Sequence, residues 1–131
     1  MKGNAMPALP KQPKPHDKYA LRVAWTAEID VSRHARARGD ADAEWTHLER
    51  AHVLSQPLPA AHVRTHLAML AVGIRHRDMR EIAGQLVRLA VAGPGSASRR
   101  YPVGNTGGSN VSATAPMPIA ADLRAVLDLP T

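Results

Sequence analysis

Residues 40–66 read DADAEWTHLERAHVLSQPLPAAHVRTH, and they contain the start signals of two consecutive helices. Asp40 is a preferred N-cap residue, and the acidic residues after it suit the positive end of a helix dipole, which predicts a helix over residues 41–55. Pro59 predicts a second helix over residues 59–74, because its missing N–H costs nothing in a first helical turn. The short connection between the two predicts neighbouring, antiparallel helices.

The rest of the chain predicts further helices and one long loop. Apolar residues at helical spacing indicate helices over residues 19–38, 79–92 and 120–127. Residues 93–118 are rich in glycine and proline, and their interspersed apolar residues favour a loop that wraps over the helices. The expected fold is an all-α bundle of about four main helices, with this wrapping loop and a short last helix. Its short helix-turn-helix connections resemble the packing of tetratricopeptide repeats.

Length and composition agree with a small helical domain. The chain has 131 residues, enough for one hydrophobic core, and 44% of them are apolar. Aromatic residues make up only 3% and phenylalanine is absent, so the core must consist of small aliphatic side chains, which suit packed helices better than a β-sandwich. Residues 1–18 are rich in proline and lysine, and we expect a disordered basic lead-in there, followed by a single helical domain over residues 19–131.

Several classes of protein are excluded or disfavoured by the same sequence. No stretch approaches the roughly 20 apolar residues that span a bilayer, and the N-terminus lacks a signal-peptide core, so we expect a cytoplasmic protein with no membrane partner. The absence of cysteine excludes disulfides and thiolate metal sites. The net charge of +6 permits an anionic partner, but no nucleic-acid-binding motif or aromatic interleaving is present, so we expect no sequence-specific nucleic acid partner.

Three histidines fall on the helix faces that should meet in the bundle. At about 100° per residue, His52 lies within about 20° of the centre of the apolar stripe of its helix, and Glu49 within about 40°. His62 and His66 are one turn apart on the core-facing stripe of the next helix, so their rings can reach a common point. His47 points to the opposite side of its helix and is not expected to join them.

The first functional hypothesis is therefore a transition-metal site formed by Glu49, His52, His62 and His66. Three neutral imidazoles and one carboxylate suit one divalent ion of zinc, iron, nickel or copper. If only the histidines are ligands, Glu49 is free to act as a general base toward a metal-bound water. The sequence leaves open whether the protein is an enzyme. The competing interpretation is that the three histidines are hydrogen-bonded residues of the core.

A second hypothesis is a helical-hairpin module that binds a protein partner without metal. The groove between the first two helices would be the binding surface, and Trp45 would be its anchor, since interface hot spots are enriched in tryptophan. Trp45 can equally be a residue of the core. The oligomeric state is not predicted by the sequence.

Two parts of the chain resemble a family of small bacterial proteins of unknown function. The segments are WTHLERAHVLSQ (45–56), and GNTGGSNVSA (104–113) with PMPI (116–119), and between them His62, His66 and Gly84-Gln85 fit the same pattern. The similarity covers about residues 35–127. The chain departs from the pattern at Ala120 and Ala121, where a proline and an acidic residue are expected to open the last helix. The resemblance implies an α-helical fold and no particular activity.

Overall fold

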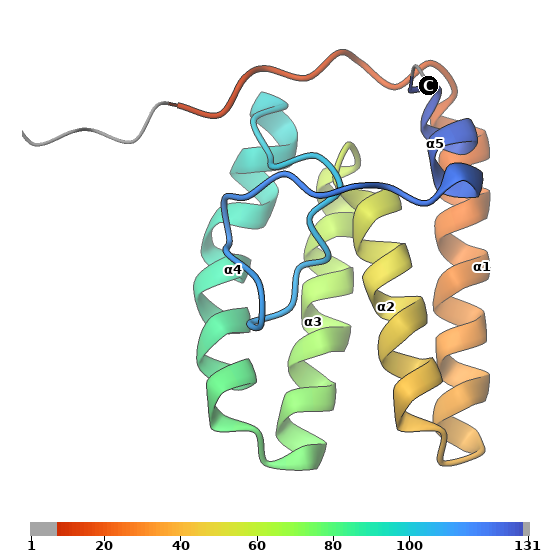
Figure 1. Cartoon of the computed structure of the whole chain (residues 1–131), viewed down its shortest axis with the longest axis vertical. Coiled ribbons are helices and arrows are strands. Elements are labelled where there is room, and N and C mark those ends of the chain that lie inside the picture. Colours follow the sequence, from red (N-terminus) through yellow and green to blue (C-terminus); the bar gives the residue numbers. More distant parts are fainter. Residues whose placement is uncertain (1–7, 130–131) are drawn as a thin grey trace, which may run out of the picture.

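The computed structural model describes residues 8–129, which form five helices and no strands (Figure 1). This confirms the predicted all-α bundle of four main helices followed by a short one. Residues 1–7 of the predicted lead-in, and residues 130–131 of the predicted domain, lie outside the described part of the chain. The helices are α1 (Lys18–Ala37), α2 (Ala41–Ser55), α3 (Pro59–His76), α4 (Met79–Ser98) and α5 (Ala121–Leu127).

The four long helices form two consecutive hairpins, α1–α2 and α3–α4, which pack against each other through α2 and α3 (Figure 1). The first turn contains Gly39 at a φ of 73°, and Asp40 caps α2 by accepting a hydrogen bond from the backbone N–H of Ala43, as predicted. In the turn of the second hairpin, between α3 and α4, Arg77 lies in the left-handed region, and Asp78 caps α4 in the same way as Asp40 caps α2. The likeness to tetratricopeptide packing stays a prediction.

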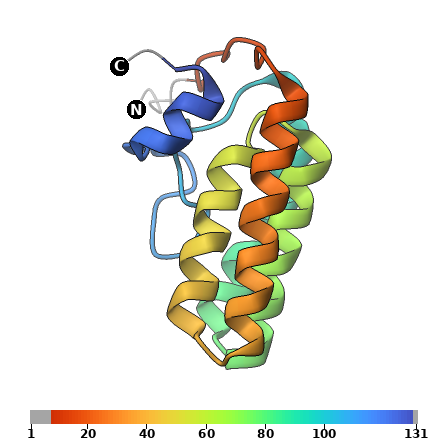
Figure 2. The ribbon, with the colours of Figure 1, turned by 90° about the vertical axis from the view of Figure 1, so that its right-hand side faces the viewer.

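The apolar core lies between α1, α2 and α3. One cluster of buried residues includes Leu21, Leu54 and Leu123, and it fixes α5 across one end of the bundle (Figure 2). A second cluster further along the helices includes Leu48 and Met69. Among the described residues, no helix combines the length and apolar character needed to cross a membrane.

Helix α4 is longer than the sequence predicted. The expected end at residue 92 was wrong, because α4 continues through Pro94 to Ser98. Glycine and proline at residues 93–95 weaken a helix but do not end it where tertiary contacts stabilise the next turn. Here the buried hydroxyl of Ser96 donates a hydrogen bond to the backbone carbonyl of Gln56, at 2.6 Å, which attaches the last turn of α4 to the end of α2.

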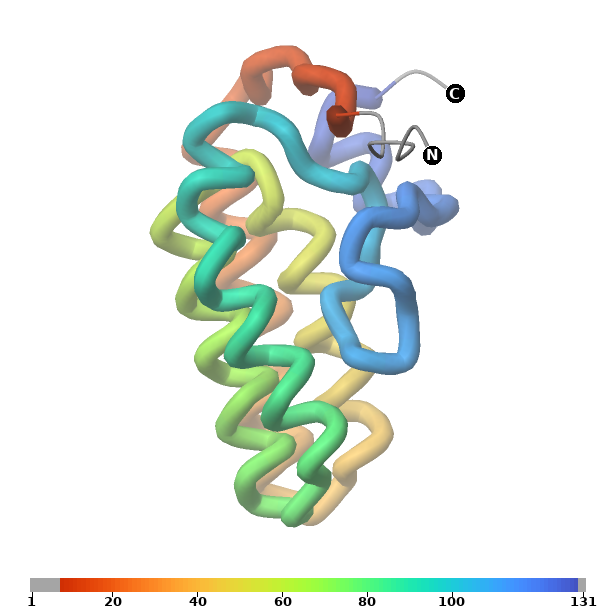
Figure 3. The backbone as a smooth tube through the Cα atoms, turned by 90° about the vertical axis from the view of Figure 1, so that its left-hand side faces the viewer, coloured from red at the N-terminus to blue at the C-terminus, as the bar shows by residue number. Residues whose placement is uncertain are grey.

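The segment after α4 wraps over the helices, as predicted, although it begins six residues later than expected. Figure 3 shows it running beside α4 and α2 before it reaches α5. Arg88 of α4 holds it by donating to the carbonyls of Gly108 and Val111, and Tyr101, a residue of the segment itself, is buried. At the other terminus, residues 8–17 cross the end of the bundle in extended form, and Gln12 donates its backbone N–H to the carbonyl of Arg99.

The core assignment predicts a large difference between two leucines. Leu54→Ala should lower the free energy of unfolding by about 2–5 kcal/mol, because the side chain is fully buried and its removal leaves a cavity. Leu67→Ala, the same change on a side chain that is 50% exposed, should cost about 1 kcal/mol or less. Urea unfolding followed by circular dichroism measures both, and equal losses would contradict the assignment.

Candidate metal centre

The structure brings together the three histidines that the sequence placed on facing helix stripes. His52 extends from α2, and His62 and His66 extend from α3, each no more than 6% exposed. Their Nε2 atoms form a nearly equilateral triangle, with distances of 3.0 Å from His52 to each of the others and 3.1 Å between His62 and His66. These ligand atoms lie close enough together to share one metal ion.

The hydrogen bond of His52 fixes which of its ring nitrogens carries the proton. Its Nδ1 lies 2.6 Å from the backbone carbonyl oxygen of Asn105, in the loop after α4. A carbonyl oxygen only accepts hydrogen bonds, so Nδ1 must be the donor. In the neutral ring, Nε2 is then left with a free lone pair that points into the triangle.

The same reasoning applies to His62. Its Nδ1 lies 2.6 Å from the hydroxyl oxygen of Ser96, and that hydroxyl donates its single proton to the carbonyl of Gln56. Ser96 therefore accepts from His62, whose Nδ1 must carry the proton. The Nε2 of His62 is left as a second free acceptor.

His66 completes the set through Gln85 of α4. Its Nδ1 lies 2.6 Å from the side-chain oxygen of Gln85. The Gln85 amide nitrogen donates to a carboxylate oxygen of Glu81, at 2.6 Å, and to the carbonyl of Gly107, at 2.9 Å. Both of these are acceptors, which settles the orientation of the amide and leaves its oxygen to accept from His66. All three Nε2 lone pairs therefore converge on one point.

No proton is available to bridge these lone pairs. Burial lowers the pKa of His62 to about 3, and it also lowers the pKa of His52 and of His66, with the neighbouring imidazoles adding to the effect for His52 and His62. At neutral pH the three rings are therefore uncharged. Three acceptors that face one another at 3.0–3.1 Å repel, and a cation between them turns that repulsion into attraction.

The loop after α4 makes a close approach to the His52 ring. Gly107 has a φ of 85°, and a Cβ atom on it would lie 2.5 Å from Cδ2 of His52. Only glycine can occupy this position without displacing the imidazole. Asn105 holds the loop in shape, because its side-chain nitrogen donates to the carbonyls of Ser112 and Ala115 and its oxygen accepts from the N–H of Gly107.

A family model covers almost all of the domain described above. It matches residues 19–127, a range that includes the three histidines and every acceptor on their Nδ1 atoms. The chain belongs to the family described as "Protein of unknown function (DUF3703)". The description of this family names no activity, so the chemistry of the site rests on its geometry. No curated protein and no solved structure matches the chain.

Glu49, the fourth predicted ligand, is not among the side chains whose ligand atoms gather at the triangle. It accepts a hydrogen bond from the indole nitrogen of Trp45 instead, at 3.0 Å, and burial raises its pKa. The carboxylate that reaches the histidines indirectly is Glu81, through Gln85. The sequence pattern did not predict Glu81 or the three acceptors, because all four lie on α4 or on the loop, outside the α2–α3 pair whose facing stripes carry the histidines.

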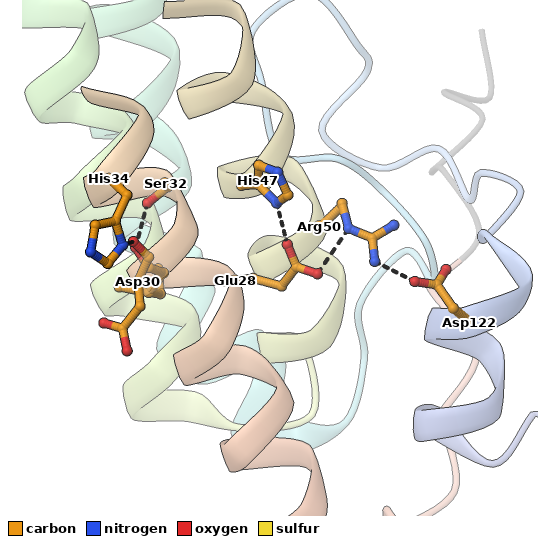
Figure 4. Close-up of polar contacts among 8 residues, drawn as sticks. Glu28, Asp30, Ser32, His34, His47, Arg50 and Asp122 are labelled. Atoms are coloured by element: carbon orange, nitrogen blue, oxygen red, sulfur yellow. Dashed lines mark hydrogen bonds and ion pairs between the residues drawn. The ribbon is translucent and has the colours of Figure 1, made fainter. Parts of the chain in front are cut away.

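Two other residues of α2 lie away from the triangle. His47 points toward α1, where its Nδ1 lies 2.6 Å from the carboxylate of Glu28, which also accepts from Arg50; Arg50 in turn pairs with Asp122 of α5 (Figure 4). Trp45, the predicted partner-binding anchor, is half-buried and packs against the second apolar cluster. Partner binding through Trp45 therefore stays a prediction.

The lowered pKa values predict that the metal-free protein is sensitive to acid. Exposed histidines of the unfolded chain titrate near pH 6.5, so between that pH and the lower folded pKa values the unfolded state binds more protons. The contribution of the three rings to stability should be complete above about pH 6.5 and should decrease as the pH falls toward about 5. Urea unfolding across this pH range, with a chelator present to keep the protein free of metal, measures the decrease in stability.

Two variants serve as controls for this prediction. His62→Gln should make the pH dependence shallower, because one buried titrating ring is removed. His47→Gln should retain the loss of stability that comes from the cluster, because it leaves the three buried rings in place. An unfolding midpoint that does not change between about pH 7 and pH 5 would rule out three buried neutral rings.

Proposed function

We propose that this chain is a metal-binding protein that holds one divalent transition-metal ion on the Nε2 atoms of His52, His62 and His66. The observation that carries the proposal is that three Nε2 lone pairs converge. Each of the three rings has its proton on Nδ1, which donates it to an acceptor outside the cluster. A neutral imidazole with its second nitrogen hydrogen-bonded in this way is the usual form of a histidine ligand.

The number of protein ligands supports a site with an open coordination position. The three Nε2 atoms lie 3.0–3.1 Å from one another, close enough to bind one ion together. They would supply three ligands, and a four-coordinate ion would then have one position left for a further ligand. Imidazole donors suit zinc, iron, nickel and copper, which remain the candidate metals.

The shell around the histidines supports metal binding over a purely structural role. Each Nδ1 acceptor orients its ring, and the link from His66 through Gln85 to Glu81 places one negative charge near the ion. In a metal-free core, neighbouring histidines would be expected to donate to one another as well, so that no two lone pairs face each other. Here no Nε2 atom has a proton to donate, so hydrogen bonding alone does not explain the arrangement.

Metal analysis of the purified, untagged protein tests the proposal. We expect about one equivalent of transition metal per chain, bound less tightly as the pH falls through about 6.5, where free imidazoles become protonated. His52→Ala, His62→Ala and His66→Ala should each abolish binding, and chelation should lower the melting temperature of the unmodified protein but not that of these three variants. His47→Ala is the control, because that ring contacts Glu28 and not the cluster. A chain that takes up no transition metal at micromolar concentration would overturn the proposal.

A second test concerns the orientation of one ligand. Ser96→Ala removes the acceptor on Nδ1 of His62, and it should weaken metal binding by about 10–100-fold, as loss of such a partner does in other metal sites. Ser98→Ala makes the same change two residues later, at an exposed hydroxyl that donates to Gly95, and should leave the affinity unchanged. Competition with a chromogenic chelator measures both. Equal affinities for the two variants would contradict the role given to Ser96.

A further inference from the structure

A cavity of about 490 Å³ adjoins the three imidazoles, which form part of its wall. Its lining comes mainly from α4, from the loop after α4 and from the histidines of α2 and α3. Figure 3 shows that loop running beside α4. Cavities of this size hold small organic molecules in other proteins. Apart from the histidines, its lining is mainly apolar and includes Val87, Val91, Ala92, Pro94, Pro102 and Ala113.

The charges around the cavity favour an anion. Three neutral imidazoles leave the full charge of a divalent ion uncompensated. Glu81 contributes one negative charge near His66, but the guanidinium of Arg88, which the loop carbonyls hold in place, lies near the same rings and offsets it. Arg100 adds a further positive charge to the cavity lining. A site with an excess of positive charge attracts a negatively charged ligand.

We propose that this cavity binds an organic carboxylate with a short apolar tail. The carboxylate would take the open coordination position of the ion, where it compensates the positive charge, and the tail would lie against the valine and proline side chains of α4 and the loop. Carboxylate oxygen is an accepted ligand of each candidate metal. This inference rests on the proposed metal site, and it adds the chemical class of the ligand that the site receives.

The test uses the full chain loaded with Co²⁺, whose visible absorption reports its ligands, after metal analysis has established the amount bound. Hexanoate should change the spectrum and should bind about tenfold or more tightly than acetate, because its four additional methylene groups would leave water. 1-Hexanol, which has a similar tail and no charge, should leave the spectrum unchanged. The metal-free protein should bind hexanoate about tenfold or more weakly, since the carboxylate would then lack its partner.

Two tryptophan variants on α4 locate the binding site. Val91→Trp places a large side chain in the cavity lining and should weaken hexanoate binding about tenfold or more without changing the amount of metal bound. Leu86→Trp makes a similar change at an exposed position outside the lining and should have no effect on either measurement.

The outcomes separate the two proposals. A protein that binds no metal overturns both. A protein that binds metal overturns this inference alone if acetate and hexanoate bind equally, if 1-hexanol gives the same spectral change, or if Val91→Trp and Leu86→Trp behave alike. A preference for hexanoate that requires the ion and is lost only in Val91→Trp supports the carboxylate site.

Discussion

Three protons, one on the outer nitrogen of each of three histidines, link α2 and α3 to α4 and the loop after it. Each of those nitrogens needs an acceptor that cannot offer a proton in return, and the chain supplies one from Asn105, one from Ser96 and one from Gln85. Two of these belong to α4 and one to the loop, whereas the histidines belong to α2 and α3. The orientation of the rings therefore exists only when both hairpins and the loop are assembled.

This division explains why the two sides of the α2–α3 pair are so different. Both apolar clusters consist of residues from α1, α2, α3, α5 and the segments that join them, and neither includes a described residue of α4. The buried residues of α4 are instead mostly polar, namely Glu81, Gln85 and Ser96, together with Ala92. A buried polar network is favourable only when every member is satisfied, so α4 and the loop depend on a complete set of partners where α1 depends on apolar contact.

Helical periodicity was sufficient to predict the histidines and insufficient to predict their surroundings. The angular positions of His52, His62 and His66 follow from spacing alone, because α2 and α3 are regular and joined by a short turn. Glu49 was expected on the same stripe. The angular position of a residue does not determine which way its side chain turns, and the indole of Trp45, one turn away, donates a hydrogen bond to the Glu49 carboxylate. The extension of α4 through residues 93–98 was not predictable either, since it depends on a tertiary hydrogen bond that no local pattern encodes.

The loop illustrates why a distinctive sequence can be essential to a site without contributing a ligand atom to it. The acceptor for His52 is a backbone carbonyl, which every residue type possesses, so no side chain at residue 105 is needed to provide it. What the sequence must specify is the path of the backbone. Asn105 does this with three hydrogen bonds of its own side chain to the loop, and Gly107 does it by allowing the backbone to approach the imidazole ring. Asn105 and Gly107 therefore fix the path of the loop, and the loop in turn orients the ring of His52 through the backbone carbonyl of residue 105.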